Sequence, residues 1–436
     1  MNKKKLSLAV AVAMALPMTA QAAGFQLAEY SATGLGRAFA GEAAMADNAG
    51  AQWRNPAMLT YLDGTQVSTG LIYVDPNIDV DGYVTKGLAT GGKTVATSSH
   101  DMAPSAFIPN FYLSHKLNDQ WAVGLAIATN FGMETELENS FLATHFGNET
   151  SVTTIEFNPN VAYQLTPELS IGGGLRLVHG EGSVGAKTPS NVTVAPGVTI
   201  PKGLPLKYMS GDDLAFGWQL GAAWQLNQNN RIGVSYRSEV DLNLEGNAQI
   251  FNKKQMKVVH APGSLELTLP ATAEIASYHQ LTDKWAMHAS FNWTDWSSFE
   301  KLEADIPTMG GAVPVKNEYW EDNYRFAIGT TYQYSQALTL RSGIAYDTSA
   351  VSDANRTLSI PETDRTWLSL GLGYQATPQL TIDAAFTYII AKDAKVSEPR
   401  AVGDDGEKEG SQLYGQFHGN VTGSIWLAGV QASYHF

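Results

Sequence analysis

The chain offers few residues that could carry out catalysis. None of its 436 residues is Cys, which excludes thiol enzymes, zinc ribbons, iron–sulfur proteins and disulfide scaffolds. Its 9 His residues form no H-E-x-x-H zinc motif, and no G-x-S-x-G nucleophile elbow is present. The residue types and spacings therefore predict that the protein is not an enzyme.

Two other patterns could bind ligands, and neither is convincing. Gly34-Leu35-Gly36 resembles part of a dinucleotide-binding loop, but no strand precedes it and position 39 is Phe instead of the third Gly. The acidic run over residues 404–409 could bind divalent ions that bridge lipopolysaccharide, although a solvated loop is the simpler interpretation. We expect no cofactor and no metal.

The composition contains a contradiction that the fold must explain. The chain has 28 Lys and Arg against 42 Asp and Glu, a net charge of −14, so a partner rich in phosphate such as nucleic acid is not expected. Charged residues are only 16% of the chain, against roughly 25% in typical soluble domains. A mean hydropathy of −0.15 argues against a helical membrane protein. Few charges and many aromatics are unusual in an acidic soluble protein.

The N-terminus has the three parts of a secretory signal. Lys3, Lys4 and Lys5 are followed by an apolar run over residues 6–16 and by the cleavage pattern Ala20-Gln21-Ala22. No later stretch reaches the 18 or so apolar residues of a membrane helix. The sequence predicts a signal peptide over residues 1–22 and an exported mature protein.

Beyond residue 66 the apolar residues recur with a period of two, which indicates β-strands. The segment 231–247 is the clearest case and is predicted to be one strand. Its apolar face consists of Ile232, Val234, Tyr236, Val240, Leu242 and Leu244. Its polar face consists of Ser235, Arg237, Glu239, Asp241, Asn243 and Glu245. A charged face in a protein with few charges predicts apolar surroundings outside the strand and water inside.

Strand counting and turn spacing together predict a barrel. The predicted strands are 66–75, 105–117, 120–130, 151–165, 168–180, 213–226, 231–247, 262–280, 284–297, 316–334, 338–350, 357–376, 379–392 and 411–436. Tight turns such as Asn118-Asp119 and Thr166-Pro167 alternate with longer polar segments such as 187–213 and 392–410, as in outer-membrane barrels.

Aromatic residues near the strand ends and at the C-terminus support this prediction. We expect Trp121, Trp224, Trp285, Tyr334, Tyr374 and Tyr434 to form interfacial girdles. The predicted fold is all-β, a 14-stranded antiparallel transmembrane β-barrel over residues 66–436. A secreted β-sandwich or β-helix would leave the charged strand face and the C-terminal Phe436 unexplained.

Residues 23–65 do not alternate and cannot form a core of their own. The segment is rich in Gly and Ala and contains Asn55-Pro56-Ala57 near its end. A barrel of 14 strands encloses more space than side chains of the wall can fill. We therefore predict that this segment is a hatch, or plug, inside the lumen.

The hatch carries a specific resemblance. It resembles the N-terminal hatch of the FadL family, outer-membrane transporters of long-chain fatty acids in Gram-negative bacteria. The matching hatch segments are Gly24-Phe25-Gln26-Leu27, Gly34-Leu35-Gly36-Arg37-Ala38, Ala46-Asp47 and Asn55-Pro56-Ala57. Further matches are Asn118-Asp119-Gln120, Asn130-Phe131-Gly132, Tyr236-Arg237-Ser238-Glu239-Val240, Tyr324-Arg325, Gly329-Thr330-Thr331-Tyr332 and Ser359-Ile360-Pro361.

The resemblance implies a mechanism of import. It implies a monomer that binds a hydrophobic ligand among its extracellular loops, passes it to a site inside the barrel, and needs no energy-coupling partner. Rearrangement of the hatch would open the path by passive diffusion. Exit would be lateral, at a kink in the third strand that matches Asn130-Phe131-Gly132.

The resemblance also implies roles for single residues. Phe25 matches the hatch aromatic at the inner site, and Lys316 matches a lysine that meets the acidic head of the ligand. Asp347 matches an acidic residue that would orient a cation in the lumen. A second head-group cation of the family aligns near Ala186, and the adjacent Lys187 is the candidate substitute.

Two alternatives to fatty acid import stay open. The family also includes importers of neutral monoaromatic hydrocarbons, which would not need Lys316. A structural or adhesive barrel, whose loops serve as a receptor that phages exploit, is the third hypothesis. Outer-membrane lipid and lipopolysaccharide are the expected surroundings in every case.

Overall fold

The structure is a computed structural model that describes residues 24–436 except 253–254 and 401–404. The predicted signal peptide, residues 1–22, lies outside the described residues. Among the helices that the structure describes, none combines the length and the apolar character of a membrane-spanning helix.

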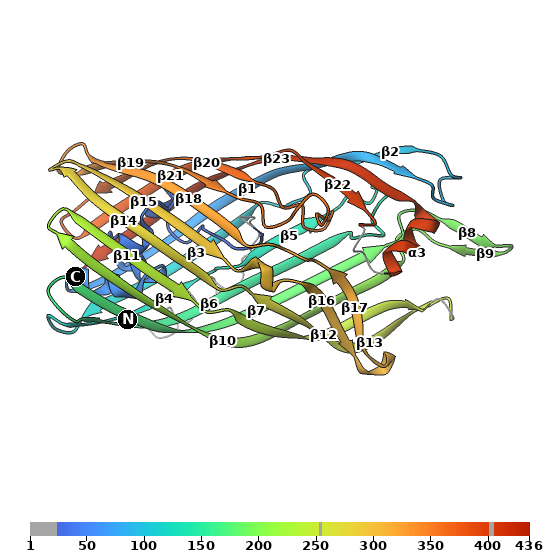
Figure 1. The fold of residues 1–436 in the computed structure, drawn as a ribbon, viewed down its shortest axis with the longest axis horizontal. Coiled ribbons are helices and arrows are strands. Elements are labelled where there is room, and N and C mark those ends of the chain that lie inside the picture. The colour runs from blue at the N-terminus through green and yellow to red at the C-terminus, as the bar shows by residue number, and fades with distance from the viewer. Residues whose placement is uncertain (1–23, 253–254, 401–404) are drawn as a thin grey trace.

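Fourteen strands pair antiparallel in chain order and close into a barrel (Figure 1). They are β1 (Thr65–Thr85), β3 (Ala106–Lys116), β4 (Trp121–Ala128), β6 (Glu149–Gln164), β7 (Leu169–Lys187), β10 (Pro205–Asn227), β11 (Asn230–Arg237), β14 (Thr272–Thr282), β15 (Trp285–Thr294), β18 (Asn323–Gln333), β19 (Leu338–Asp347), β20 (Arg365–Gln375), β21 (Leu380–Ala391) and β23 (Gln416–His435). Closure runs between β1 and β23, from Gln66↔His435 to Thr85↔Gln416. The predicted 14-stranded antiparallel barrel is confirmed.

Further strands lengthen the wall at one end. They are β2 (Val95–Ser99), β5 (Gly132–Glu136), β12 (Val240–Asn252), β13 (Lys257–Leu269), β16 (Lys301–Ile306), β17 (Gly311–Asn317) and β22 (Ala394–Glu398). A separate hairpin, β8 (Val192–Ala195) with β9 (Val198–Ile200), and the helix α3 (Asp405–Tyr414) lie at this end (Figure 1). The expected acidic loop is wrong from residue 405 onward, because these residues begin α3; Asp404 lies outside the described residues.

The opposite end carries the short turns, as the sequence predicts. The turns after β3, β6, β10, β14, β18 and β20 contain at most four residues between strands. The predicted girdle aromatics are all large, exposed side chains on or beside these strand ends: Trp121, Trp224, Trp285, Tyr334, Tyr374 and Tyr434. Their exposed rings give this end of the wall the amphipathic belt that an interface between lipid and water favours.

The wall reverses its polarity partway along its length. Val234 and Tyr236 are exposed on β11, whereas Val240, Leu242 and Leu244 on β12 are at most 2% exposed. A continuous strand would keep all five on one face, since successive side chains alternate. Two residues, 238 and 239, lie outside the ladder between β11 and β12, and the Ser238 hydroxyl accepts a bond of 3.0 Å from the Trp218 N–H. The prediction of one strand over 231–247 is therefore wrong.

The hatch consists of short helical turns held by capping side chains. They are α2 (Ala32–Leu35) and three 3₁₀ turns, Glu42–Ala44, Ala49–Trp53 and Pro56–Tyr61. Ser31, Asn48 and Asn55 each accept a hydrogen bond from the N–H two or three residues later, which satisfies a donor that the turn leaves open. Nearly all of these residues are buried, and the turns contact wall strands around the lumen (blue in Figure 1).

Candidate functional site

Wall glycines let the hatch approach the barrel closely. A Cβ on Gly221 would lie 2.0 Å from Asn55 Oδ1, and one on Gly172 would lie 2.5 Å from the Ala57 nitrogen. Asn55 Nδ2 also donates to the Ala222 carbonyl at 3.0 Å. The structure thus places the predicted hatch motif, Asn55-Pro56-Ala57, directly against β7 and β10, where any larger wall residue would push it away.

Buried ion pairs fasten the hatch at the level of its helical turns. Glu156 lies between Arg176 at 2.9 Å and Arg237 at 2.5 Å, and all three side chains are at most 3% exposed. Arg237 also donates to the Trp53 carbonyl at 2.6 Å and lies over the Trp53 ring. Buried charges of this kind persist only when paired and hydrogen-bonded. This level of the lumen is therefore polar and occupied.

Asp347 belongs to a similar buried ion pair that holds the hatch, and we call such pairs clamps. Its Oδ1 is 2.8 Å from Arg325 Nε, and its Oδ2 accepts a 2.7 Å bond from the Trp367 indole. Arg325 in turn donates to the Ala38 carbonyl of the hatch at 3.0 Å. The predicted site residue Asp347 thus orients a cation that holds the hatch, and its partners differ from those of Lys316.

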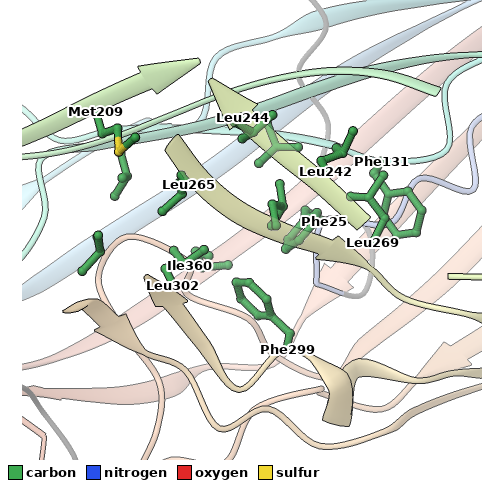
Figure 2. Packing of buried hydrophobic residues seen from close by; sticks show 14 of the residues in the cluster. Phe25, Phe131, Met209, Leu242, Leu244, Leu265, Leu269, Phe299, Leu302 and Ile360 are labelled. Atoms are coloured by element: carbon green, nitrogen blue, oxygen red, sulfur yellow. The ribbon is translucent and has the colours of Figure 1, made fainter. Parts of the chain in front are cut away.

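Phe25 lies in a cluster of aromatic rings at the N-terminal edge of the hatch (Figure 2). Its ring centroid is 4.6 Å from that of Trp296 and 5.6 Å from that of Phe299, both edge-on. Phe131 and Trp320 each lie 6.0 Å away. Such edge-on pairs add to the free energy gained by burying the ring.

The third barrel strand is interrupted where Phe25 meets it. β4 ends at Ala128↔Glu156 and β5 starts at Gly132↔Thr153, so three residues oppose two on β6. The hatch fills the interruption, since Gly132 N–H donates to the Phe25 carbonyl and Leu27 N–H to the Asn130 carbonyl, both at 2.8 Å. A Cβ on Gly132 would lie 3.2 Å from Leu27 Cδ1, so the glycine allows this close pairing.

The second strand loses its partner beside this interruption. β3 pairs with β1 as far as Val74↔Ala106, but with β4 only from Lys116↔Ala122 to Phe111↔Ile127. Within the described residues, 106–110 therefore have a ladder partner on one side only, and we call them the unpaired β3 edge. Asn110 is 3% exposed, and neither atom of its amide finds a hydrogen-bond partner among the described residues.

Beyond the polarity reversal, toward the end of the barrel that carries the long loops, the side chains in the lumen are apolar. We call this the upper part of the lumen. Figure 2 shows side chains from several strands pointing into this common interior. Members of this upper apolar cluster include Phe25, Phe131, Met209, Leu242, Leu244, Leu265, Leu269, Phe299, Leu302, Val315 and Ile360. The cluster thus extends from the hatch and the interrupted strand to the loops around Lys316.

Lys316 lies at the edge of the upper apolar cluster and is 3% exposed. Its Nζ donates to Ser359 Oγ at 2.9 Å and is 3.3 Å from Glu398 Oε1, a side chain with no exposed surface. The predicted strand 316–334 is wrong, because Lys316 lies near the end of β17, which ends at Asn317, and β18 starts only at Asn323. A lysine that sequence reasoning treats as the start of a barrel strand is instead a buried, paired cation under the loops.

Lys187 occupies a separate cavity of about 250 Å³ near the rim, which Lys207 also lines. Lys187 Nζ donates to Asn139 Oδ1 at 2.7 Å. Lys207 is the register partner of Ala186 and donates to the Val315 carbonyl at 2.6 Å, one residue from Lys316. Sequence reasoning missed Lys207, because only the pairing of β10 with β7 brings it there.

Comparison with known proteins gives one consistent family. A family described as "Outer membrane protein transport protein (OMPP1/FadL/TodX)" matches residues 13–436. Outer membrane protein P1 of Haemophilus influenzae is 37% identical, over 88% of this chain and 90% of its own length. The long-chain fatty acid transport protein of an Escherichia coli strain is 35% identical, over 99% of this chain and 98% of its own.

Solved structures share the fold. A Pseudomonas aeruginosa FadL homologue superposes with a TM-score of 0.82 at 24% identity, covering 95% of this chain and all of the homologue. The P. putida toluene transporter TodX superposes with a TM-score of 0.67 at 19% identity, covering 88% of this chain and 94% of TodX. A FadL homologue and a toluene transporter therefore share the fold of this chain.

Proposed function

Because the chain belongs to the FadL/TodX family of outer-membrane transport proteins, we propose that it imports long-chain fatty acids across the Gram-negative outer membrane. Transport of hydrophobic compounds, not catalysis, is the work of this family. The proposal adds the substrate and the route: binding in the barrel, rearrangement of the hatch and passive diffusion.

One observation carries the choice of substrate: the buried Lys316 ammonium at the edge of an apolar cluster. The cluster would receive an acyl chain, since each buried CH₂ contributes about 0.8 kcal/mol. A carboxylate that leaves water needs a charged hydrogen-bond donor, which Lys316 supplies and a neutral ligand would not use. Lys187 and Lys207, which line the rim cavity, would attract the same anion first.

In the proposed route the ligand leaves laterally, through the wall of the barrel. An acyl chain in the cluster reaches Phe25 and Phe131 at its lower boundary, where the hatch fills the interrupted third strand. Withdrawal of Phe25 and its paired backbone would expose the kink Asn130-Phe131-Gly132 next to the unpaired β3 edge. We infer that the ligand leaves there, between β3 and β4, into the lipid.

A second candidate function is import of neutral hydrophobic compounds such as monoaromatic hydrocarbons. It is favoured by the pairing of Lys316 with Glu398, which leaves the cation without a need for an anionic ligand. The two candidates differ in their dependence on the acidic head group, so a comparison of a fatty acid with its methyl ester separates them.

Uptake of labelled oleate by a strain that lacks other importers tests the proposal. We expect the chain to restore uptake, and Lys316→Ala to weaken binding of the acid more than of the ester. Lys301→Ala on the adjacent β16 is the matched control, because Lys301 is an exposed partner of Glu303. Equal binding of acid and ester would favour the second candidate, and no restored uptake would reject fatty acid import.

A cross-link across the wall tests the sideways exit. The chain has no Cys, so cysteines at Asn110 and Asn130 would be the only thiols. A flexible bismaleimide that joins them should reduce uptake without reducing binding at the cell surface. The matched pair, Leu113 with Leu125, lies in the paired part of β3 and β4, and its cross-link should leave uptake unchanged. Full uptake with both cross-links would exclude this exit.

A further inference from the structure

Lys316 is one of four ionisable side chains gathered under the loops. Lys316, Glu318, Glu398 and Arg400 are all at most 4% exposed. They come from β17, from the segment after it, and from β22 and its end. Buried charges are costly unless they are balanced, so the sum of their charges decides what else can bind here.

The formal charges of the four groups cancel. Lys316 pairs with Glu398 at 3.3 Å. Arg400 donates to the carbonyls of Asn317 and Asn355, the second at 2.8 Å, so its guanidinium is fixed beside the same strand. Two cations and two carboxylates give a net charge of zero when all are ionised.

The surrounding charges are engaged elsewhere. Lys207 donates to the Val315 carbonyl from the rim side. In the loop that supplies Ser359, Arg356 pairs with Asp353 and Glu362 pairs with Arg365 at 2.6 Å. The immediate balance around Lys316 is therefore that of the four buried groups.

A fatty acid anion would upset this balance. Placed beside Lys316, it would leave three carboxylates against two cations in a site closed to water. It would also compete with Glu398, whose Oε1 occupies the position next to Nζ and whose Oε2 has no hydrogen-bond partner in the described chain. Like charges at this distance in a low dielectric cannot all remain ionised.

We propose that Glu398 is an internal occupant of the head-group position, and that each fatty acid carboxylate enters it together with one proton. The proposal rests on fatty acid import and adds the protonation state in which the substrate is held. One anion and one proton leave the solution together, so the net charge within the site stays at zero.

Two carboxylates of the protein can accept the proton. Glu398 would take it if the ligand displaces it from Lys316. Glu318 is the other acceptor: burial raises the pKa of Glu318, an effect that Lys316 and Arg400 oppose. In either case the bound complex contains one more proton than the free protein and the free anion.

Proton uptake has a measurable slope. Above the pKa of the free carboxylates, affinity for the acid should fall about tenfold for each unit of rising pH, since one proton is consumed per ligand. Affinity for the methyl ester should stay constant over the same range. Replacing Glu398 by Gln removes the internal occupant, so E398Q should bind the anion without a proton.

Calorimetry on the purified full-length barrel tests this, with dodecanoate as the probe. Titrations at pH 6 and pH 8 in buffers with different ionisation enthalpies count the protons taken up. We expect about one per ligand for the unchanged protein, affinity about a hundredfold lower at pH 8 than at pH 6, and no pH dependence for E398Q. Glu303→Gln on β16, a partly exposed residue, is the matched control and should behave as the unchanged protein.

The outcomes separate the two proposals. Binding of dodecanoate with no proton uptake, or an E398Q variant that keeps the full slope, would overturn the proton-linked site while leaving fatty acid import in place. Failure of every form to bind dodecanoate would overturn fatty acid import itself. Should E398Q fail to fold, the proton count of the unchanged protein decides the question alone.

Discussion

Replacing Phe25 by Ala should release the N-terminal edge of the hatch without unfolding the barrel. Phe25 is 1% exposed and touches four aromatic rings, while its carbonyl accepts from Gly132 N–H. Truncation of a buried Phe to Ala costs about 3–5 kcal/mol. Most of this cost falls on the docking of residues 24–27, because the ladder of the wall does not depend on them.

Even the lower of these two free energies has a large effect on the docking of the hatch. A loss of about 3 kcal/mol reduces the ratio of docked to undocked hatch edge by roughly 150-fold, at about 1.4 kcal/mol per factor of ten. Hydrogen exchange would report this loss at two amides, Leu27 and Gly132, whose bonds of 2.8 Å join the hatch edge to the interrupted strand. Protection elsewhere in β6 and β7 should not change.

A matched variant separates hatch release from general damage. Phe326 is 52% exposed on the outer face of β18, so Phe326→Ala removes the same atoms without touching the hatch. It should leave exchange at Leu27 and Gly132 unchanged. If Phe25→Ala leaves these two amides as protected as Phe326→Ala does, Phe25 does not hold the hatch edge and the coupling of its movement to opening is refuted.

Three other changes test the clamps and the loops. Glu156→Gln should lower the free energy of unfolding by about 3–5 kcal/mol, as two buried arginines lose their counter-ion, whereas Glu181→Gln on the exposed face should not alter thermal unfolding in detergent. Gly221→Val should push the hatch inward and raise the ionic conductance of single barrels in lipid bilayers, and Gly173→Val, whose side chain would meet Leu220 instead, should not. Burial lowers the pKa of His145 to about 3 from 6.5. The docked loop therefore binds fewer protons than the open loop, and its docking on Gly415 should weaken by about 2 kcal/mol between pH 7 and pH 5. Proteolysis that is no faster at pH 5 than at pH 7, or that is equally pH-dependent in His145→Gln, would contradict this.

The barrel could be predicted from the sequence because its signals are local. Alternation along segments such as 379–392 depends only on neighbouring residues, and turn residues such as Asn118-Asp119 end strands by their own backbone preferences. The two strands of each hairpin can therefore be predicted from the residues of that hairpin alone. Closure follows once the first and last strands are both long and alternating.

The polarity reversal could not be predicted by the same reasoning. Tyr236 and Val240 have the same parity, so a pattern read along the chain assigns them to one face. Only the contact of Ser238 with Trp218 on β10 shows that the ladder is interrupted between them. The low charge content of the chain consequently has two sources, an outer band of apolar residues and an apolar upper lumen, of which the sequence indicates only the first.

The charge partners of the site depend on long-range pairing and were equally hidden. Lys316 and Glu398 are 82 residues apart, and Lys207 reaches Val315 across 108 residues. Family resemblance identifies Lys316 as a candidate cation for binding the ligand. Nothing near Lys316 in the sequence indicates that its ammonium is already paired with a carboxylate of the protein, that of Glu398. The sequence was sufficient to identify the cation, but not to show that it forms a buried ion pair.

The vertical order of the lumen gives a physical reason for a sideways exit. An acyl chain in the upper apolar cluster would meet, below it, the buried pairs around Glu156 and the tightly packed hatch motif. Passing that level means separating buried charges, at several kcal/mol for each broken pair. Continued register would set the unpaired β3 edge opposite residues 128–132, and Phe131 there belongs to the apolar cluster. A hydrophobic ligand at that height needs only the hatch edge to move, and the lipid beyond the wall solvates it as well as the cluster does.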